Sequence, residues 1–171
     1  MLHNTVLLPQ ADNVHINKVG GSGKENWVFG TNYPNDAVAP YFDNANERGS
    51  WRVEVLPAAP ATIDNFLNVI QVADNQCNKL NDIRYIGNEV IAGVQLADRV
   101  VTFAKDSELL HKNFTLAING AGTFKFVITD LKAGNWQVKK DGSVFIPLTE
   151  VQVSDGVLAF EGTAGCYEFC R

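Results

Sequence analysis

Flat aromatic rings beside amide and acid groups are the side chains of this sequence best suited to holding a ligand. Trp27, Asn32, Tyr33 and Asp36 lie close together in a loop-rich stretch. An exposed ring stacks on the apolar face of a sugar, and nearby amide and carboxylate groups hydrogen-bond to its hydroxyls. We therefore predict that these four residues bind a ligand, with carbohydrate as the ligand class.

The same aromatic rings can instead fill a core, because burying one removes a large apolar area from water. Trp51 alternates with Val53 and Val55 along an apparent strand. We therefore expect Trp51 to be a core residue, whereas Trp27 and Tyr33 flank a loop and stay candidates for ligand contact.

No nucleophile or phosphate-binding motif is complete. Gly20–Lys24 is similar to part of a phosphate-binding loop, but Lys18 stands where the first glycine belongs and Glu25 where Ser or Thr belongs. The Gly-x-Ser-x-Gly frame of a serine nucleophile is also missing. We predict no catalytic residues and no cofactor.

Histidines and carboxylates form no recognisable catalytic pair. His3, His15 and His111 lack the spacing of metal ligands. Glu54 and Glu161 are candidates for a glycosidase-type carboxylate pair only because such pairs can come from anywhere in a sandwich. Solvent-facing strand positions are the simpler interpretation of both.

A metal site is not expected either. The loop from Asn32 to Asn46 holds Asp36 and Asp43, but the dense alternation of acids that calcium needs is missing, so turn formation is the preferred interpretation. The cysteines are odd in number, and we expect free thiols. They are Cys77, Cys166 and Cys170.

Composition excludes several classes of protein. The chain has 171 residues, is 46% hydrophobic and 19% charged, and carries a formal net charge of −5. Nucleic acids and highly sulfated or uronate polymers are held by Lys and Arg, so an acidic chain favours neither, although a local basic patch could exist within the total. No apolar run is long enough to span a bilayer, and the start of the chain lacks a signal peptide. We expect a soluble chain of unknown localisation.

Short strands followed by turn signals dominate the sequence. Trp51–Val55 and Phe124–Thr129 alternate apolar and polar residues, which places one face in a core. Phe66–Val72 is apolar on both faces and is expected to be an interior strand. Glu89–Leu96 and Arg99–Phe103 are rich in the β-branched residues that strands favour.

Turn signals separate these strands. Four pairs of residues suit tight hairpins because Asn, Asp and Gly tolerate positive φ. They are Gly87-Asn88, Asn119-Gly120, Asp141-Gly142 and Asp155-Gly156. The pattern predicts an all-β fold, an antiparallel sandwich of two packed sheets, forming one domain over residues 1–171. Long loops fill the first fifty residues, and the best helical candidate is the short segment Lys105–Lys112.

Several segments resemble the C-terminal β-sandwich region of heparinase II/III-like polysaccharide lyases. They are Leu7–Pro9, Lys18–Gly21, Trp27–Tyr33, Gly49–Pro57, Asp64–Val69 and Thr129–Trp136. Members of that family carry their eliminating residues mostly on a helical toroid and the adjoining large β domain. This chain has no helical toroid, so no catalytic residue is carried over. The resemblance implies a bacterial, carbohydrate-linked, non-catalytic module of a periplasmic or extracellular parent protein.

Three functions stay open. The first is an accessory sandwich that packs on a catalytic partner domain, and it predicts an apolar docking patch. The second is a free-standing carbohydrate-binding protein with exposed Trp or Tyr in a groove. The third is a small lyase or hydrolase that uses residues of the N-terminal loops, and it predicts a cleft with a pKa-shifted pair. A homodimer would overlap with the first function.

Overall fold

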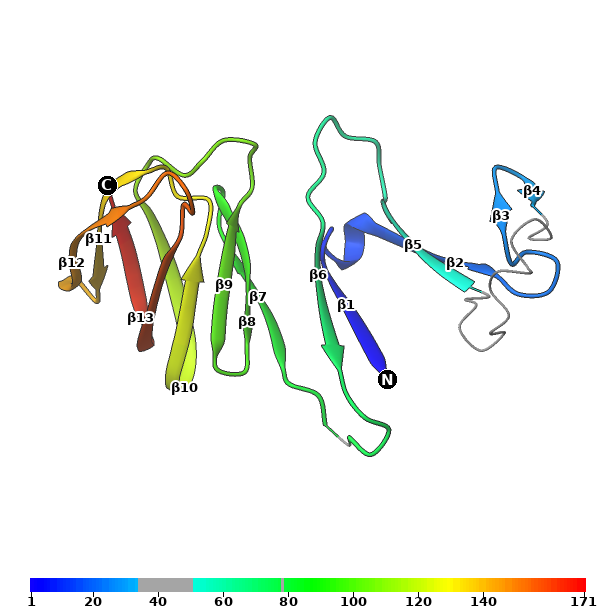
Figure 1. The fold of residues 1–171 in the computed structure, drawn as a ribbon, viewed down its shortest axis with the longest axis horizontal. Helices are drawn as coiled ribbons and strands as arrows, with labels where there is room; N and C mark the ends of the chain where they lie inside the picture. Colours follow the sequence, from blue (N-terminus) through cyan, green and yellow to red (C-terminus); the bar gives the residue numbers. More distant parts are fainter. Residues whose placement is uncertain (34–50, 78) are drawn as a thin grey trace. The chain divides into compact units, whose positions relative to one another are not determined.

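The computed structural model describes residues 1–33, 51–77 and 79–171 of the chain. These residues form thirteen strands and one 3-10 turn (Figure 1). The elements of the N-terminal part are β1 (Leu2–Leu8), η1 (Ala11–Asn13), β2 (Val14–Gly20), β3 (Trp27–Val28), β4 (Thr31–Asn32), β5 (Trp51–Pro57) and β6 (Leu67–Val72). The C-terminal part holds β7 (Ile83–Gly87), β8 (Ile91–Leu96), β9 (Arg99–Ala104), β10 (Phe114–Ile128), β11 (Gly134–Lys140), β12 (Ser143–Val151) and β13 (Leu158–Cys170).

The chain divides into two compact units. The first unit comprises Met1–Leu7 and Leu67–Arg171, and the second comprises Leu8–Phe66. The extent of 1–171 as one domain stays a prediction. In the part of the chain that the structure describes, no helix is long and apolar enough to cross a membrane.

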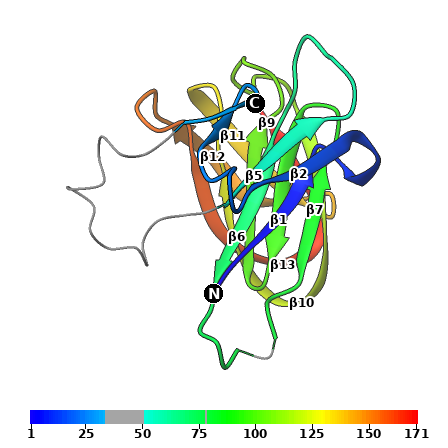
Figure 2. The same cartoon turned by 90° about the vertical axis from the view of Figure 1, so that its right-hand side faces the viewer.

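The all-β sandwich class is confirmed. In the first unit, seven strands form one sheet in the order β12-β11-β13-β10-β9-β8-β7. Strand β1 pairs with β6 in a separate two-stranded sheet, and the two strands lie side by side in Figure 2. The neighbours in the seven-stranded sheet run antiparallel except β9 and β10, which run parallel. The short helix expected at Lys105–Lys112 is wrong, because Leu110 instead makes an isolated parallel bridge with Leu131.

One core fills the inner face of the seven-stranded sheet. The buried cluster joins Ile91 and Val100 from one end of the sheet to Trp136 and Val138 from the other. Side chains from opposite ends of one sheet can share a core only if the sheet folds over and packs its own inner face together. Trp136 is fully buried and donates its indole N–H to the Lys132 carbonyl oxygen at 2.9 Å.

Glycines decide where the long strands β10 and β13 depart from regular pairing. The sequence predicts a hairpin at Asn119-Gly120, but β10 continues through this pair, and the register with β13 shifts between Ile118 and Thr123. Gly120 and Gly122 have φ of 123° and 93° there, so the glycines support a bulge and not a hairpin. The Asp141-Gly142 hairpin between β11 and β12 is confirmed, with both residues at positive φ.

The described residues of the second unit form no such core. Strands β2 and β5 pair antiparallel from Val14↔Pro57 to Gly20↔Trp51, and we refer to this pair as the β2–β5 ribbon. Strands β3 and β4 form a minimal hairpin. In the first unit, Phe66–Val72, expected as an interior strand, supplies β6 at 67–72, and among the described strands β6 pairs with β1 alone. That expectation was wrong, since Ile70 and Val72 are exposed.

Candidate functional site

The candidate site is a hollow of about 890 Å³ in the second unit. It lies where the end of the β2–β5 ribbon meets the loop and hairpin that follow β2, and we refer to it as the hollow. The side chains that give it chemical character are two indoles, three cations and one carboxylate. They belong to Trp27, Trp51, Lys18, Lys24, Arg52 and Glu54.

The β3–β4 hairpin supplies Trp27. Its turn residues Phe29 and Gly30 both have positive φ, 46° and 86°, which is the geometry that matches a two-residue turn to the twist of its strands. Trp27 pairs directly with Asn32 across the hairpin. The ring of Phe29 at the tip is fully exposed.

Asn32 holds the loop before the hairpin in place. Its Oδ1 accepts the Asn26 N–H at 2.8 Å, and its Nδ2 donates to Glu25 Oε2 at 3.3 Å. The other Glu25 oxygen accepts the Gly23 N–H at 3.1 Å. The Glu25 carboxylate is stabilised in its ionised form by the backbone N–H of Glu25 itself, the Gly23 N–H and the Asn32 amide. The pKa of Glu25 therefore lies below the usual value for a glutamate.

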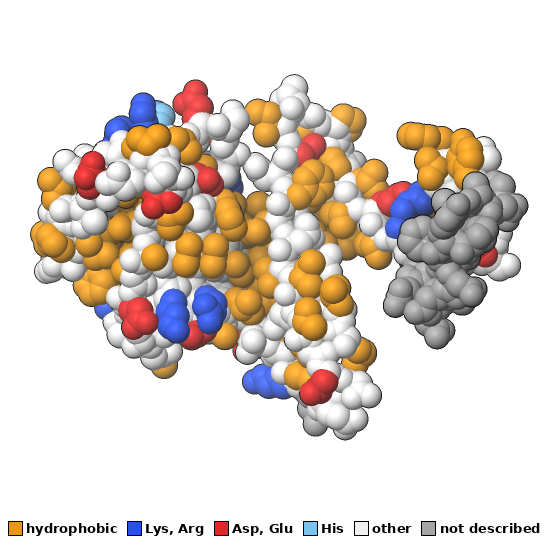
Figure 3. Space-filling model, viewed as in Figure 1, with side chains coloured by type: hydrophobic (Ala, Val, Ile, Leu, Met, Phe, Trp, Pro, Cys, Tyr) orange, Lys and Arg blue, Asp and Glu red, His pale blue; other side chains and the backbone are white. Residues whose placement is uncertain are grey.

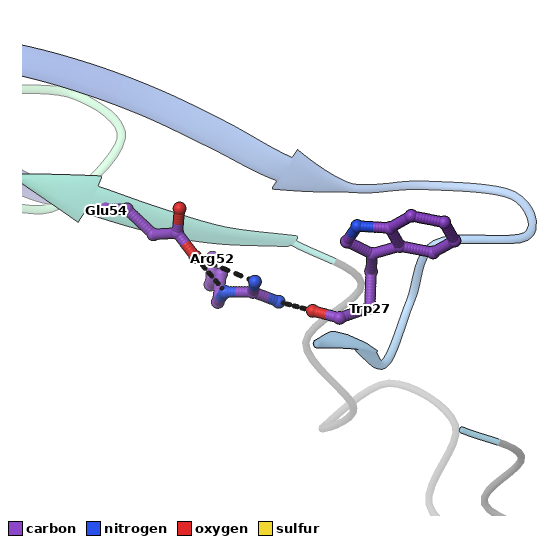
Figure 4. Close-up of polar contacts among 3 residues, drawn as sticks. All are labelled: Trp27, Arg52 and Glu54. Carbon is purple, nitrogen blue, oxygen red and sulfur yellow. Dashed lines mark hydrogen bonds and ion pairs between the residues drawn. The ribbon is translucent and has the colours of Figure 1, made fainter. Parts of the chain in front are cut away.

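Arg52 connects the ribbon to the hairpin (Figure 4). Its Nε donates to Glu54 Oε1 at 2.7 Å, and Nη2 lies 2.7 Å from the same oxygen. Nη1 donates to the main-chain carbonyl oxygen of Trp27. Arg52 and Glu54 are two apart on one strand, so both side chains leave the same face of β5. One guanidinium therefore bridges β5 and β3.

A lysine lies over each indole of the hollow. Lys18 Nζ is 4.2 Å from the centre of the Trp51 ring, and Lys24 Nζ is 5.4 Å from that of Trp27. Such contacts are attractive because the ring face is electron-rich. Trp51 also lies against Gly21, where a Cβ would come within 2.7 Å of the indole, so any side chain at position 21 would displace the ring.

The structure brings together only part of the predicted ligand-binding set. Trp27 lines the hollow, whereas Asn32 and Tyr33 lie next to it in the chain without lining it. The side-chain amide of Asn32 is hydrogen-bonded to Asn26 and Glu25, and Tyr33 is 56% exposed. Asp36 lies outside the described residues. Ligand binding by these four residues stays a prediction.

The prediction for Trp51 differs from the structure. Trp51 is 53% exposed, so the expectation of a core residue is wrong. The alternation Trp51-Arg52-Val53-Glu54 places Arg52 and Glu54 on one face, which is the signal from which their pairing could have been inferred, although we did not predict it. The contacts of Lys18 and Lys24 could not be predicted from the sequence, because they depend on the indoles that these lysines face in the fold.

Among the residues that the structure describes, no group of three His, Cys, Asp or Glu side chains is placed to hold a metal ion. Glu54 is held by Arg52. Outside the hollow, burial and, to a smaller degree, Asp141 raise the pKa of Tyr167, while burial followed by Glu168 raises that of Cys170.

Comparison with known families assigns the C-terminal half of the chain. The family model described as the heparinase II C-terminal domain matches residues 85–171. The chain belongs to the heparinase II C-terminal domain family. No curated protein matches it. The suspected resemblance is confirmed, and of the segments that carried it, Thr129–Trp136 lies within the matched range.

The range of the match has a consequence for the hollow. The matched heparinase II C-terminal domain spans most of β7 and all of β8 to β13, which is the seven-stranded sheet. The hollow is lined by residues between Lys18 and Glu54, which precede that range. The family assignment therefore describes the sheet and leaves the chemistry of the hollow open.

Proposed function

We propose that the chain is a non-catalytic accessory module of a polysaccharide-lyase-type protein and packs on a catalytic partner domain. Membership of the heparinase II C-terminal domain family supports the association with such proteins. The observation that supports docking on a partner is exposed apolar surface, which Figure 3 shows in orange. Part of it belongs to the β2–β5 ribbon and part to strand β6.

One face of the β2–β5 ribbon is apolar and exposed. The pairs Gly20↔Trp51, Lys18↔Val53 and Ile16↔Val55 place their side chains on the same face, because residues directly opposite in an antiparallel pair share a face. Ile16 is 57% exposed and Val53 is 61% exposed. Contiguous exposed apolar surface of this kind marks a protein–protein interface.

Strand β6 presents a second apolar face. Ile70 and Val72 point to the same side of the strand and are exposed, while Val69, the residue before Ile70, is buried on the other side. A two-stranded sheet with one uncovered apolar face is marginal by itself in water. A partner domain that covers it would stabilise both proteins.

Binding to a heparinase-type catalytic domain, measured by calorimetry, tests the docking function. We expect the wild-type chain to bind and the double variant Ile16→Ser, Val53→Ser to bind at least about tenfold more weakly, because apolar contact area is lost. Lys125→Ala, an exposed change on β10, is the matched control. Equal affinity of the double variant and the wild type would reject the ribbon face as the interface.

The non-catalytic part of the proposal has its own assay. Elimination at a uronate introduces a double bond that absorbs ultraviolet light, so lyase turnover is seen directly on acidic polysaccharides. We expect the purified chain alone to show none. Turnover that depends on Glu54 or a histidine would instead support the small-lyase alternative.

Carbohydrate binding in the hollow is the second candidate function. Two indoles offer apolar faces for sugar rings, and among the described residues that line the hollow the cations Lys18, Lys24 and Arg52 outnumber the carboxylate of Glu54. The hollow is thus locally basic within an acidic chain, which favours a saccharide carrying carboxylate or sulfate groups.

A glycan array followed by titration of any bound glycan tests this second function. We expect Trp27→Ala and Trp51→Ala each to weaken binding by about fivefold or more, since each removes an aromatic contact worth roughly 1 kcal/mol. Lys18→Ala should weaken acidic glycans more than neutral ones. No binding by the wild-type chain to any glycan would leave the docking function alone.

A further inference from the structure

We propose that Arg52 and Glu54 are positioning residues that set the orientation of Trp27 in the hollow. The ring of Trp27 can act as a platform only if the backbone that carries it is fixed. The hairpin that carries it is very short, with two residues in each of β3 and β4. A two-stranded hairpin of this length has little stability of its own.

The contacts within the loop and hairpin are local. Trp27 N–H donates to the Lys24 carbonyl at 3.3 Å, Tyr33 N–H donates to the Asn26 carbonyl at 3.3 Å, and Asn32 bonds to Asn26 and Glu25. These bonds shape the hairpin but do not attach it to the ribbon. Among the described residues, the hydrogen bond that joins β3–β4 to the ribbon is the one from Arg52 Nη1 to the Trp27 carbonyl oxygen.

The guanidinium is itself held in place. Glu54 Oε1 accepts from Nε and lies at the same 2.7 Å from Nη2, which leaves Nη1 directed at Trp27 (Figure 4). A planar guanidinium can serve a carboxylate and a carbonyl at once in fixed directions, which an ammonium cannot. Glu54 thus orients Arg52, Arg52 fixes the Trp27 carbonyl, and the fixed backbone sets where the Trp27 ring lies.

The same contacts argue against Arg52 acting mainly as a ligand for an acidic saccharide. Its charge is already paired with Glu54, whereas Lys18 and Lys24 lie over the indoles and make no ion pair among the described residues. The two lysines are therefore the cations free to meet an anionic group, and Arg52 is the structural one. Only the binding part of the test below rests on the saccharide function proposed above.

Two-dimensional NMR of the ¹⁵N-labelled chain, without any ligand, tests the positioning directly. Trp27, Trp51 and Trp136 each give an indole N–H signal, and Trp27→Phe identifies the first. We expect Arg52→Ala to shift the Trp27 signal and to lower its heteronuclear NOE, while the buried Trp136 signal stays unchanged and confirms the fold. Arg52→Lys should give an intermediate change and serves if the alanine variant does not fold. Arg99→Ala, which removes the exposed pair with Asp98, is the matched control.

Saccharide affinity gives a second test, because the two possible roles of Arg52 predict opposite effects of Glu54→Gln. If Arg52 positions Trp27, Glu54→Gln weakens saccharide binding, and Arg52→Ala weakens it by about tenfold. If Arg52 instead contacts an acidic saccharide itself, Glu54→Gln frees its charge and strengthens binding. Stronger binding, or an unchanged Trp27 signal in Arg52→Ala, would overturn the proposal. A chain that binds no saccharide but loses order at Trp27 would refute the binding function and leave the positioning intact.

Discussion

Two tryptophans in alternating strands end in opposite environments. Trp136 of β11 is fully buried, and Trp51 of β5 is 53% exposed. Both are flanked by alternating valines or polar residues in the sequence, so the local pattern does not separate them. The strand that carries Trp136 belongs to a sheet of seven that closes over its own inner face. Among the strands that the structure describes, β5 pairs with β2 alone.

The comparison shows that alternation selects a face but does not bury it. Burial needs a second layer opposite that face, and the seven-stranded sheet supplies one from its own strands. The buried cluster that joins Ile91 and Val100 at one end of the sheet to Trp136 and Val138 at the other shows this packing. The β2–β5 ribbon has an apolar face of the same chemical character, which is why we assign its second layer to a partner protein.

Removal of the two indoles should give the largest contrast between the regions. We expect Trp136→Ala to lower the free energy of unfolding by about 3–5 kcal/mol, because it leaves a cavity in a closed core and removes a satisfied indole hydrogen bond. Trp51→Ala should cost about 1 kcal/mol or less. Chemical denaturation followed by circular dichroism measures both.

Equal losses for the two variants would contradict the contrast. A large loss at Trp51 would mean that the isolated chain already covers the ribbon face in solution, for instance by pairing with a second copy. Light scattering at several protein concentrations distinguishes this case, because the stability of a dimer rises with concentration.

Replacing one glycine by alanine in each region should also distinguish the seven-stranded sheet from the hollow, with a smaller loss of stability. In Gly93→Ala, the new Cβ would lie 2.4 Å from the Val101 carbonyl oxygen and 2.9 Å from Thr102 Cγ2, and backbone in a closed sheet cannot move aside. We expect a loss of about 1–3 kcal/mol. In Gly21→Ala, the new Cβ would meet the half-exposed ring of Trp51, which can shift, so only the strain of a φ of 83° remains, about 1 kcal/mol.

Hydrogen exchange, which reports on each region separately, is the measurement for these two variants. Protection should fall across β7 to β9 in Gly93→Ala and only around the hollow in Gly21→Ala. A milder effect at Gly93 than at Gly21 would show that the seven-stranded sheet is less tightly packed than its burial indicates.

The fold class was predictable because strand and turn signals are local. Asp141-Gly142 forms a hairpin as expected, since both residues reach positive φ without help from the rest of the fold. The hairpin predicted at Asn119-Gly120 was wrong because these residues permit either a hairpin or a bulge. The long pairing of β10 with β13 selects the bulge. Lys105–Lys112 failed as a helix because Leu110 is fixed by Leu131, a partner distant in sequence.

The candidate site was predictable only in part. Trp27 could be singled out, because a ring beside a loop suggests exposure. Arg52 could be seen to pair with Glu54 but not to reach the Trp27 carbonyl, since that bond joins residues 25 positions apart. Lys18 and Trp51 meet across two strands, so their contact depends on a register that no local pattern reveals.

The loop that leads to the hairpin should lose its hydrogen bonds to Glu25 only at a pH below the range in which ordinary glutamates titrate, and this is the smallest effect that we predict. Glu25 has a pKa below the usual glutamate value, because its carboxylate accepts N–H groups from its own backbone and from Gly23, and from the Asn32 amide. A lowered pKa in the folded chain means that these bonds stabilise the loop above the unfolded pKa, and that the stabilisation is lost as the pH falls through the folded pKa. Backbone NMR shifts of Gly23 and Asn32 should therefore move together below the ordinary range of glutamate titration, and Glu25→Gln should abolish the transition. Shifts that move at the ordinary glutamate pKa would show that the carboxylate is free in solution and does not hold the loop.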